Sequence, residues 1–168
     1  MITIYLFNQT LDFLIYTKKI ILKLGKNRFT VSLFQEPLAL TESITTKGNV
    51  YLIDVKFNDS FSDILTLLKQ IRQSDPIGKI ICFVPNESFA LALLNAHVEP
   101  FSYFCKNKHI SDKLFERYLL EMIEAAIAAI EQNYVKDYIH FQDSLIKKRV
   151  ERSKIMYVEN FSREKKLK

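Results

Sequence analysis

Asp54 follows an unbroken apolar run and is the first candidate for a functional group. Residues 50–53 (Val-Tyr-Leu-Ile) precede it without a charge. Such a run is typical of a strand that is buried on both faces of a parallel sheet. Open α/β sheets carry their chemistry at the carboxyl ends of their strands, so a functional carboxylate is expected here. An aspartate that only caps the following helix would give the same pattern, and this alternative stays open.

The chain offers little other chemistry. Its three glycines cannot build a glycine-rich phosphate loop, and its three histidines lack ligand spacing. Cys82 and Cys105 lie in apolar runs, which favours small core residues in a reducing compartment over a disulfide or a metal pair. No nucleophile and base stand at usable spacing, which disfavours a flavodoxin-like enzyme or nucleotide binder. We therefore expect no enzymatic activity, no metal site and no cofactor.

Apolar strand patterns and helical patterns alternate five times. Strands are expected at 2–6, 29–34, 50–54, 79–84 and 101–105, and helices at 11–25, 37–47, 60–74, 87–96 and 111–132. Alternation with short links predicts an α/β fold, in which a five-stranded parallel sheet has helices on both faces. Its size is that of a flavodoxin-like domain. In that topology the carboxyl ends of the first, third, fourth and fifth strands converge, which brings together Phe7, Asn8, Asp54, Pro85, Asn86 and Lys106.

The C-terminal part has a different pattern. Residues 138–142 and 145–150 are expected to form two β segments around a turn, and residues 155–159 a third. We therefore expect a domain at 1–133 and a separate segment at 134–168.

Charge is distributed unevenly between these parts. Residues 1–133 carry 14 Lys and Arg against 14 Asp and Glu, whereas residues 134–168 carry 10 against 5. A basic tail suggests a polyanionic partner such as nucleic acid, or it is simply a solvated tail. Neither a signal peptide nor a membrane span is evident, so a soluble cytoplasmic protein is expected.

Several short motifs occur in the order typical of one family. Residues 52–55 (Leu-Ile-Asp-Val) are similar to a phosphoacceptor strand, and Ile71-Arg72 before Pro76 is similar to the end of that family's third helix. Residues 98–106 resemble its conserved-lysine segment, and residues 155–159 (Ile-Met-Tyr-Val-Glu) resemble the entry to its second domain. The chain thus resembles a LytTR-type response regulator of the AgrA and ComE group. Such a protein has a CheY-like receiver followed by a LytTR DNA-binding domain, here in truncated form.

The resemblance implies a cytoplasmic response regulator of a two-component phosphorelay, in a peptide-pheromone (quorum-sensing) system that regulates transcription. It implies that Asp54 is the phosphoacceptor and Lys106 the conserved lysine. Its partners would be a sensor histidine kinase and a second regulator, in a homodimer or heterodimer formed through the last receiver helix. The apolar stripe on that helix consists of Met122, Ile123, Ala126, Ile127 and Ile130. Core packing accounts for most such stripes and is the alternative to a dimer surface.

Three positions depart from the family pattern. Phe7 and Asn8 stand where the family has two acidic residues that hold Mg²⁺, and Pro85 stands where it has a Ser or Thr. Magnesium prefers carboxylate and water oxygens, so Mg²⁺ would bind weakly at most. We therefore predict a degenerate phosphoacceptor site that acts through protein–protein contact, where Asp54 and Lys106 could simply form a salt bridge. The alternative is a conventional regulator in which phosphorylation of Asp54 controls DNA binding.

The basic tail is shorter than a complete LytTR domain. Its cations could neutralise phosphates without reading base sequence, so only weak DNA binding is expected. The candidate contacts are Lys147, Lys148, Arg149, Arg152 and Lys154.

Overall fold

The structure is a computed structural model of the 168-residue chain. It describes residues 1–25, 27–55, 60–96, 98–105, 111–136, 138–143 and 146–151, with the side chains described up to residue 132. The chain divides into two compact units, Met1–Ile130 and Glu131–Lys168.

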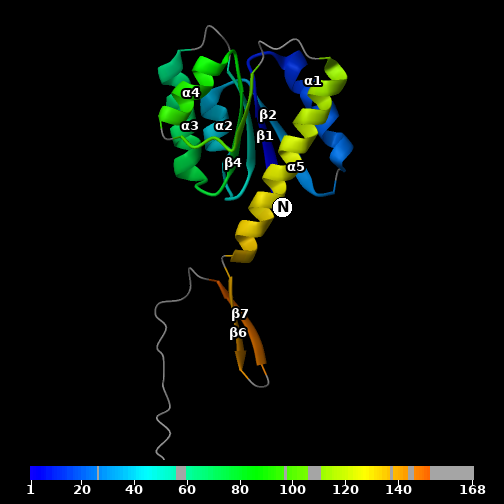
Figure 1. Cartoon of the computed structure of the whole chain (residues 1–168), viewed down its shortest axis with the longest axis vertical. Helices are drawn as coiled ribbons and strands as arrows, with labels where there is room; N and C mark the ends of the chain where they lie inside the picture. Colours follow the sequence, from blue (N-terminus) through cyan, green and yellow to red (C-terminus); the bar gives the residue numbers. More distant parts are fainter. Residues whose placement is uncertain are drawn as a thin grey trace, which may run out of the picture. The chain divides into compact units, whose positions relative to one another are not determined.

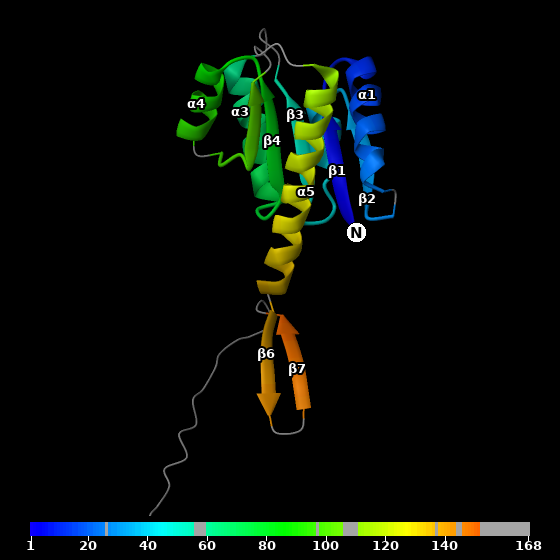
Figure 2. The ribbon, with the colours of Figure 1, turned by 45° about the vertical axis from the view of Figure 1, so that its right-hand side comes forward.

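A five-stranded parallel sheet forms the centre of the first unit. Its strands run in the order β2-β1-β3-β4-β5, and each neighbouring pair is parallel (Figure 2). The strands are β1 (Ile2–Phe7), β2 (Phe29–Phe34), β3 (Val50–Asp54), β4 (Lys79–Val84) and β5 (Ser102–Cys105). This arrangement confirms the predicted flavodoxin-like, CheY-like fold.

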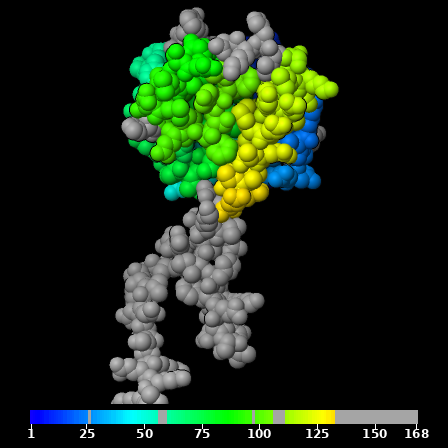
Figure 3. Space-filling model, viewed as in Figure 1, coloured from blue at the N-terminus to red at the C-terminus, as the bar shows by residue number. Residues whose placement is uncertain are grey.

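Helices cover both faces of the sheet. They are α1 (Leu11–Ile21), the short 3₁₀ helix η1 (Leu22–Leu24), α2 (Pro37–Glu42), α3 (Phe61–Ser74), α4 (Glu87–Asn95) and α5 (Asp112–Lys136). Helices α1 and α5 lie on one face, and α2, α3 and α4 lie on the other (Figure 1). The side of the unit seen in Figure 3 carries α4 in green and α5 in yellow. Two hydrophobic cores result, one on each side of the sheet.

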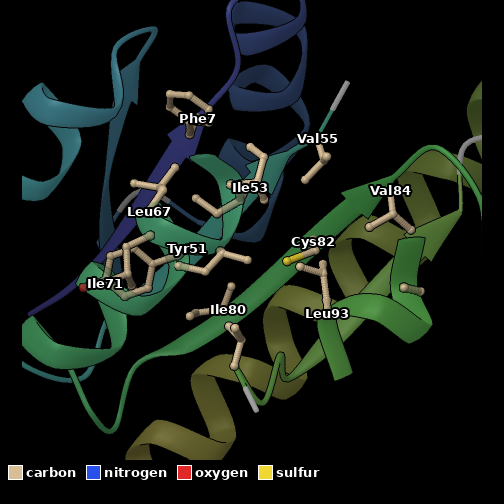
Figure 4. Packing of buried hydrophobic residues seen from close by; sticks show 14 of the residues in the cluster. Phe7, Tyr51, Ile53, Val55, Leu67, Ile71, Ile80, Cys82, Val84 and Leu93 are labelled. Atoms are coloured by element: carbon tan, nitrogen blue, oxygen red, sulfur yellow. The ribbon is translucent and has the colours of Figure 1, made fainter. Parts of the chain in front are cut away.

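Strand β3 shows why its sequence is apolar without alternation. All five of its residues are buried. Tyr51 and Ile53 pack in the core under α2, α3 and α4, where Figure 4 shows them beside Ile80 and Cys82 of β4. The alternate residue Leu52 packs in the core under α1 and α5. Because successive side chains point to opposite faces and both faces are covered, the strand is apolar at each of positions 50–53, and Asp54 stands at its carboxyl end.

The predicted helix ends are wrong at three places. The helix expected at 11–25 ends at Ile21, and the 3₁₀ helix η1 follows it. The helix expected at 37–47 ends at Glu42, and the backbone N–H of Ser43 bonds to the carbonyl of Leu40. Serine and threonine hydroxyls that follow compete for backbone hydrogen bonds, which explains the early end. The helix expected at 111–132 continues to Lys136, because neither glycine nor proline interrupts it.

The apolar stripe on α5 belongs to the core. Ile123, Ala126, Ile127 and Ile130 are buried with residues of β1, β3 and β4, and Met122 packs against the same cluster. The core alternative is therefore confirmed for this stripe. A dimer surface on α5 would have to use the exposed side of the helix.

The second unit contains an antiparallel hairpin, which consists of β6 (Tyr138–Asp143) and β7 (Ile146–Glu151). These strands correspond to the first two β segments expected in the tail. The third segment, 155–159, lies outside the described residues. The domain limit expected between 133 and 134 stays a prediction.

Candidate functional site

The carboxyl edge of the sheet brings most of the predicted site residues together. Phe7 ends β1 beside Ile53 of β3, and Asp54 ends β3 beside Phe83 of β4. Asn8 and Pro85 follow β1 and β4 directly. Lys106, the predicted lysine of this site, lies outside the described residues, so its salt bridge with Asp54 stays a prediction.

Asp54 is a buried carboxylate with an amide partner. Only 7% of the surface of Asp54 is exposed, and only 2% of the surface of Asn8. The side-chain Nδ2 of Asn8 donates a hydrogen bond to Oδ2 of Asp54. Asn8 is held in this orientation because its Oδ1 accepts from the backbone N–H of Thr10 at 2.5 Å. A hydrogen-bonded amide stabilises a carboxylate that burial would otherwise penalise.

The helix-cap alternative for Asp54 is wrong. Helix α3 begins at Phe61, and Ser60 occupies its N-cap position. Asp54 lies six residues before that cap, at the end of β3. Its position at the carboxyl edge therefore needs another explanation than helix capping.

Phe7 contributes packing at this edge and no ligand. It is 3% exposed and belongs to the core under α2, α3 and α4, where Figure 4 shows it near Ile53 and Val55. A phenyl ring offers no oxygen to a metal ion. The end of β1 thus carries a core residue, Phe7, followed by an amide, Asn8, and no acidic pair.

Aromatic rings pack beside Asp54 on the other face of the sheet. Asp54 lines a small apolar internal space together with Phe13 and Phe83. The ring of Phe83 lies 6.1 Å from that of Phe13 and 6.0 Å from that of Phe115. Phe104 joins them at 5.5 Å from Phe115. We call Phe13, Phe83, Phe104 and Phe115 the aromatic cluster, and it gives this side of Asp54 an environment of low polarity.

The loop after β4 supplies a helix cap and no hydroxyl. Asn86 is the N-cap of α4, and its Oδ1 accepts from the backbone N–H of Phe89 at 2.9 Å. Pro85 before it has neither a hydroxyl nor a backbone N–H. This loop position therefore offers no hydrogen-bond donor to a phosphoryl group.

These residues do not fit the Mg²⁺ that CheY-like receivers use. Phe7 has no ligand atom, and both polar atoms of the Asn8 side chain are already bonded, one to Asp54 and one to Thr10. Within the described ranges, no group of three His, Cys, Asp or Glu residues could hold a metal ion. A magnesium ion at Oδ2 of Asp54 would have to displace the Asn8 amide, and Phe7 and Asn8 would add no second carboxylate.

A second buried aspartate, Asp75, was not among the site residues that the sequence predicted. Asp75 is fully buried at the opposite, amino edge of the sheet. Its carboxylate accepts from the backbone N–H groups of Gly48, Asn49 and Gly78, at 2.7, 2.9 and 2.9 Å. It also accepts from Nδ2 of Asn49 and from Oη of Tyr51, at 3.0 and 2.9 Å.

Gly78 and Tyr51 are matched to this carboxylate. A Cβ added at Gly78 would lie 2.6 Å from Oδ2 of Asp75 and 2.8 Å from Cε2 of Tyr51, so no larger residue fits without movement. Burial and then the negative charge of Asp75 raise the pKa of the Tyr51 phenol far above its usual range. The signal in the sequence was Asp75-Pro76 with Gly78 closely after it, which marks a turn closed by a carboxylate.

Comparison with solved structures identifies the fold of the first unit. A CheY-like response regulator receiver domain protein from Methanospirillum hungatei JF-1 matches with a TM-score of 0.61 at 20% identity, over 79% of this chain and 98% of that one. The signal receiver domain of an HD domain-containing protein from Pseudomonas fluorescens Pf-5 matches with a TM-score of 0.59 at 16% identity, over 80% and 93%. Full-length FixJ from B. japonicum matches with a TM-score of 0.60 at 16% identity, over 80% and 62%.

No protein-family model matches the chain, and no curated protein sequence matches it. Among the described residues, no helix is both long enough and apolar enough to cross a membrane. The two-domain LytTR assignment therefore stays a prediction for residues 134–168. The first unit, in contrast, has the fold of a CheY-like receiver domain.

Proposed function

We propose that this chain is an atypical response regulator whose receiver domain works by protein–protein contact and without phosphoryl transfer to Asp54. The proposal is supported by the CheY-like fold of the first unit and by its likeness to receiver domains. The observation that carries it is the hydrogen bond from Asn8 to Asp54. The Asn8 side chain, whose amide oxygen could have been a metal ligand, instead donates a hydrogen bond from its nitrogen to the carboxylate of Asp54.

Charge stabilisation is the physical reason for this proposal. Phosphoryl transfer depends on electrostatic stabilisation of the transferring group by metal ions and fixed cations. In this chain the last residue of β1 supplies a phenyl ring, the next residue supplies a neutral amide, and the residue after β4 supplies no donor. Asp54 keeps its position at the strand end while the groups that would stabilise the transfer are missing from Phe7, Asn8 and Pro85.

The finer parts of the proposal concern partners. A two-component pathway would supply a sensor histidine kinase or a related regulator as the partner, with quorum sensing as its setting. Lys147, Lys148 and Arg149 lie in β7, so a basic strand would be available for weak binding to DNA phosphates. Arg152 and Lys154 lie outside the described residues. A dimer formed with the exposed side of α5 completes this proposal.

The test is chemical phosphorylation followed by intact-mass measurement. The full chain is incubated with acetyl phosphate and Mg²⁺, and its mass is compared with that of Asp54→Asn treated in the same way. We expect no stable gain of a phosphoryl group in either protein. A gain in the parent chain that is lost in Asp54→Asn would contradict the proposal and support the second candidate.

The second candidate is a conventional regulator that is phosphorylated at Asp54. It is favoured by the position of Asp54, which ends β3 at the carboxyl edge of a receiver-like sheet. It requires Asn8 to release the carboxylate when a phosphodonor and a metal ion arrive. The same experiment separates the two candidates, because only this one gains mass at Asp54.

A further inference from the structure

Strand β2 is the edge of the sheet opposite to β5. Within the described residues it pairs only with β1. The carbonyl of Phe34 accepts from the backbone N–H of Asn8 at 3.1 Å, so Phe34 faces β1. Because parallel strands bond through alternate residues, Ser32 faces β1 as well, and Val31 and Leu33 direct their N–H and C=O groups outward. No described residue bonds to these outward groups, so water or another strand must.

The sequence of this edge lacks the features that keep exposed strands apart. Residues 29–35 (Phe-Thr-Val-Ser-Leu-Phe-Gln) contain no charge, no proline and no glycine. Soluble proteins usually protect an exposed edge with a lysine, a proline or a bulge, whereas β2 pairs with β1 residue for residue. A continuous uncharged edge of this kind is a template for pairing with another strand.

Helix α1 adds exposed apolar side chains beside this edge. Phe13 and Tyr16 face α5, because the ring of each lies 6.4 Å from the ring of Phe115. At about 100° per residue, Leu11 and Ile15 lie on the other flank of α1, toward the β2 end of the sheet (Figure 2). Leu11 is 50% exposed and Ile15 is 40% exposed. Apolar surface therefore continues from the strand edge onto the helix.

A second copy of this chain fits this surface better than a lone peptide. Two β2 strands that pair antiparallel are related by a two-fold axis perpendicular to the sheet, so both α1 helices lie on the same face. Each α1 then covers Leu11 and Ile15 of the other, whereas a lone strand would leave them in water. Lys18 lies on the same flank, and its flexible stem lets the ammonium group stay in water.

We propose that β2 pairs antiparallel with β2 of a second copy and joins the two sheets into one. Ser32 of both copies lies at the two-fold axis, and Val31 of each copy exchanges backbone hydrogen bonds with Leu33 of the other. The paired segments carry no charge, so none is buried between them. The contact lies at the opposite end of the sheet from β5 and does not depend on Asp54, so it can fail while the proposed function holds.

The first test follows the full chain as its concentration rises, by sedimentation and by amide hydrogen exchange with NMR. When about nine-tenths of the chains are paired, exchange at Val31 and Leu33 slows about tenfold, and exchange at Ser32, whose N–H faces β1, stays unchanged. A chain that stays monomeric to millimolar concentration overturns the proposal. Association in which Val31 and Leu33 keep their fast exchange also overturns it, because another surface then forms the contact.

A charge exchange at the half-buried Ser32 tests the two-fold axis. Ser32→Lys sets two lysines opposite each other in the pair, and Ser32→Glu sets two glutamates opposite each other. Each variant alone should associate about fivefold more weakly than the parent, because like charges directly across paired strands repel. An equimolar mixture should regain the parent affinity to within about twofold through mixed pairs. A mixture that associates no better than its components overturns the proposal.

Serine at both Leu11 and Ile15 tests the flank of α1. The double variant should associate about tenfold more weakly, since both copies lose an apolar contact. Leu91→Ser on α4 is the matched control, because it removes a leucine that is 58% exposed at the other end of the sheet, and it leaves association unchanged. Equal association of the double variant, the control and the parent overturns the contact between the helices. Should a variant at Ser32 fail to fold, this pair and the exchange at Val31 decide the proposal.

Discussion

Two buried aspartates lie at opposite edges of the same sheet and have different surroundings. Asp75, at the amino edge, accepts hydrogen bonds from three backbone N–H groups, one amide and one phenol. Asp54, at the carboxyl edge, lies against the aromatic cluster and accepts from the amide of Asn8. Donors from the loop before β3 and the turn before β4 converge on Asp75, which makes it part of the architecture. Asp54 has the position of a reactive group and a partner that restrains it.

The largest expected difference between the two edges is in stability. Asp75→Asn replaces an acceptor oxygen by an NH₂ group that faces backbone N–H donors, so it should cost about 3 kcal/mol of unfolding free energy. Asp54→Asn keeps an oxygen available to Asn8 and should cost about 1 kcal/mol or less. Urea unfolding of both variants at neutral pH measures the comparison. A larger loss in Asp54→Asn would reverse our assignment of the two roles.

The next largest effect on stability is expected at Asn8, the hydrogen-bond partner of Asp54. Asn8→Asp sets two carboxylates in contact within a buried site, which should raise the pKa of the pair in the folded state. Stability is then retained below the unfolded carboxyl pKa and is lost as the pH rises, by about 2 kcal/mol at neutral pH. Urea midpoints measured from acidic to neutral pH check this, with Asn8→Ala as the control for the lost amide. A loss in Asn8→Asp that does not depend on pH would show that the two carboxylates are apart.

A smaller effect is expected at Tyr51. Burial and Asp75 raise the pKa of its phenol in the folded protein, so the unfolded state loses its proton first on alkaline titration. The stability that follows from this is present below the ordinary tyrosine pKa of about 10 and is lost as the pH rises above it. Tyr51→Phe should cost about 1 kcal/mol at neutral pH and flatten the alkaline decline. An unchanged decline in Tyr51→Phe would assign it to other groups, such as Cys82, whose pKa burial raises to about 12.

The sequence predicted the carboxyl edge of the sheet, with Asp54, better than the amino edge, with Asp75. Apolar strands have a strong pattern, so the sheet, its order of elements and the position of Asp54 at the carboxyl edge could be predicted. The contact between Asn8 and Asp54 joins residues 46 apart in the chain, and it depends on a side-chain orientation fixed by Thr10. No periodicity carries that information.

The role of Asp75 could not be predicted because most of its donors are backbone groups. Any residue at positions 48, 49 and 78 carries an N–H, so residue types give no sign of where those groups point. Among these three positions, only the glycine at 78 is a sign in the sequence, because a side chain there would collide with Asp75. Asp54 could therefore be predicted from its position at the end of an apolar strand, whereas the converging backbone donors of Asp75 could not.

The most direct test of the account is the response of the Asn8 side chain to Mg²⁺. The Nδ2 amide resonances of Asn8 are assigned by comparison with Asn8→Ala and followed by NMR as Mg²⁺ is raised to millimolar concentration. We predict a slowly exchanging amide that keeps its chemical shift throughout, because it stays bonded to Asp54. A saturable shift of these resonances, lost in Asp54→Asn, would show that Mg²⁺ displaces the amide and would contradict the central claim.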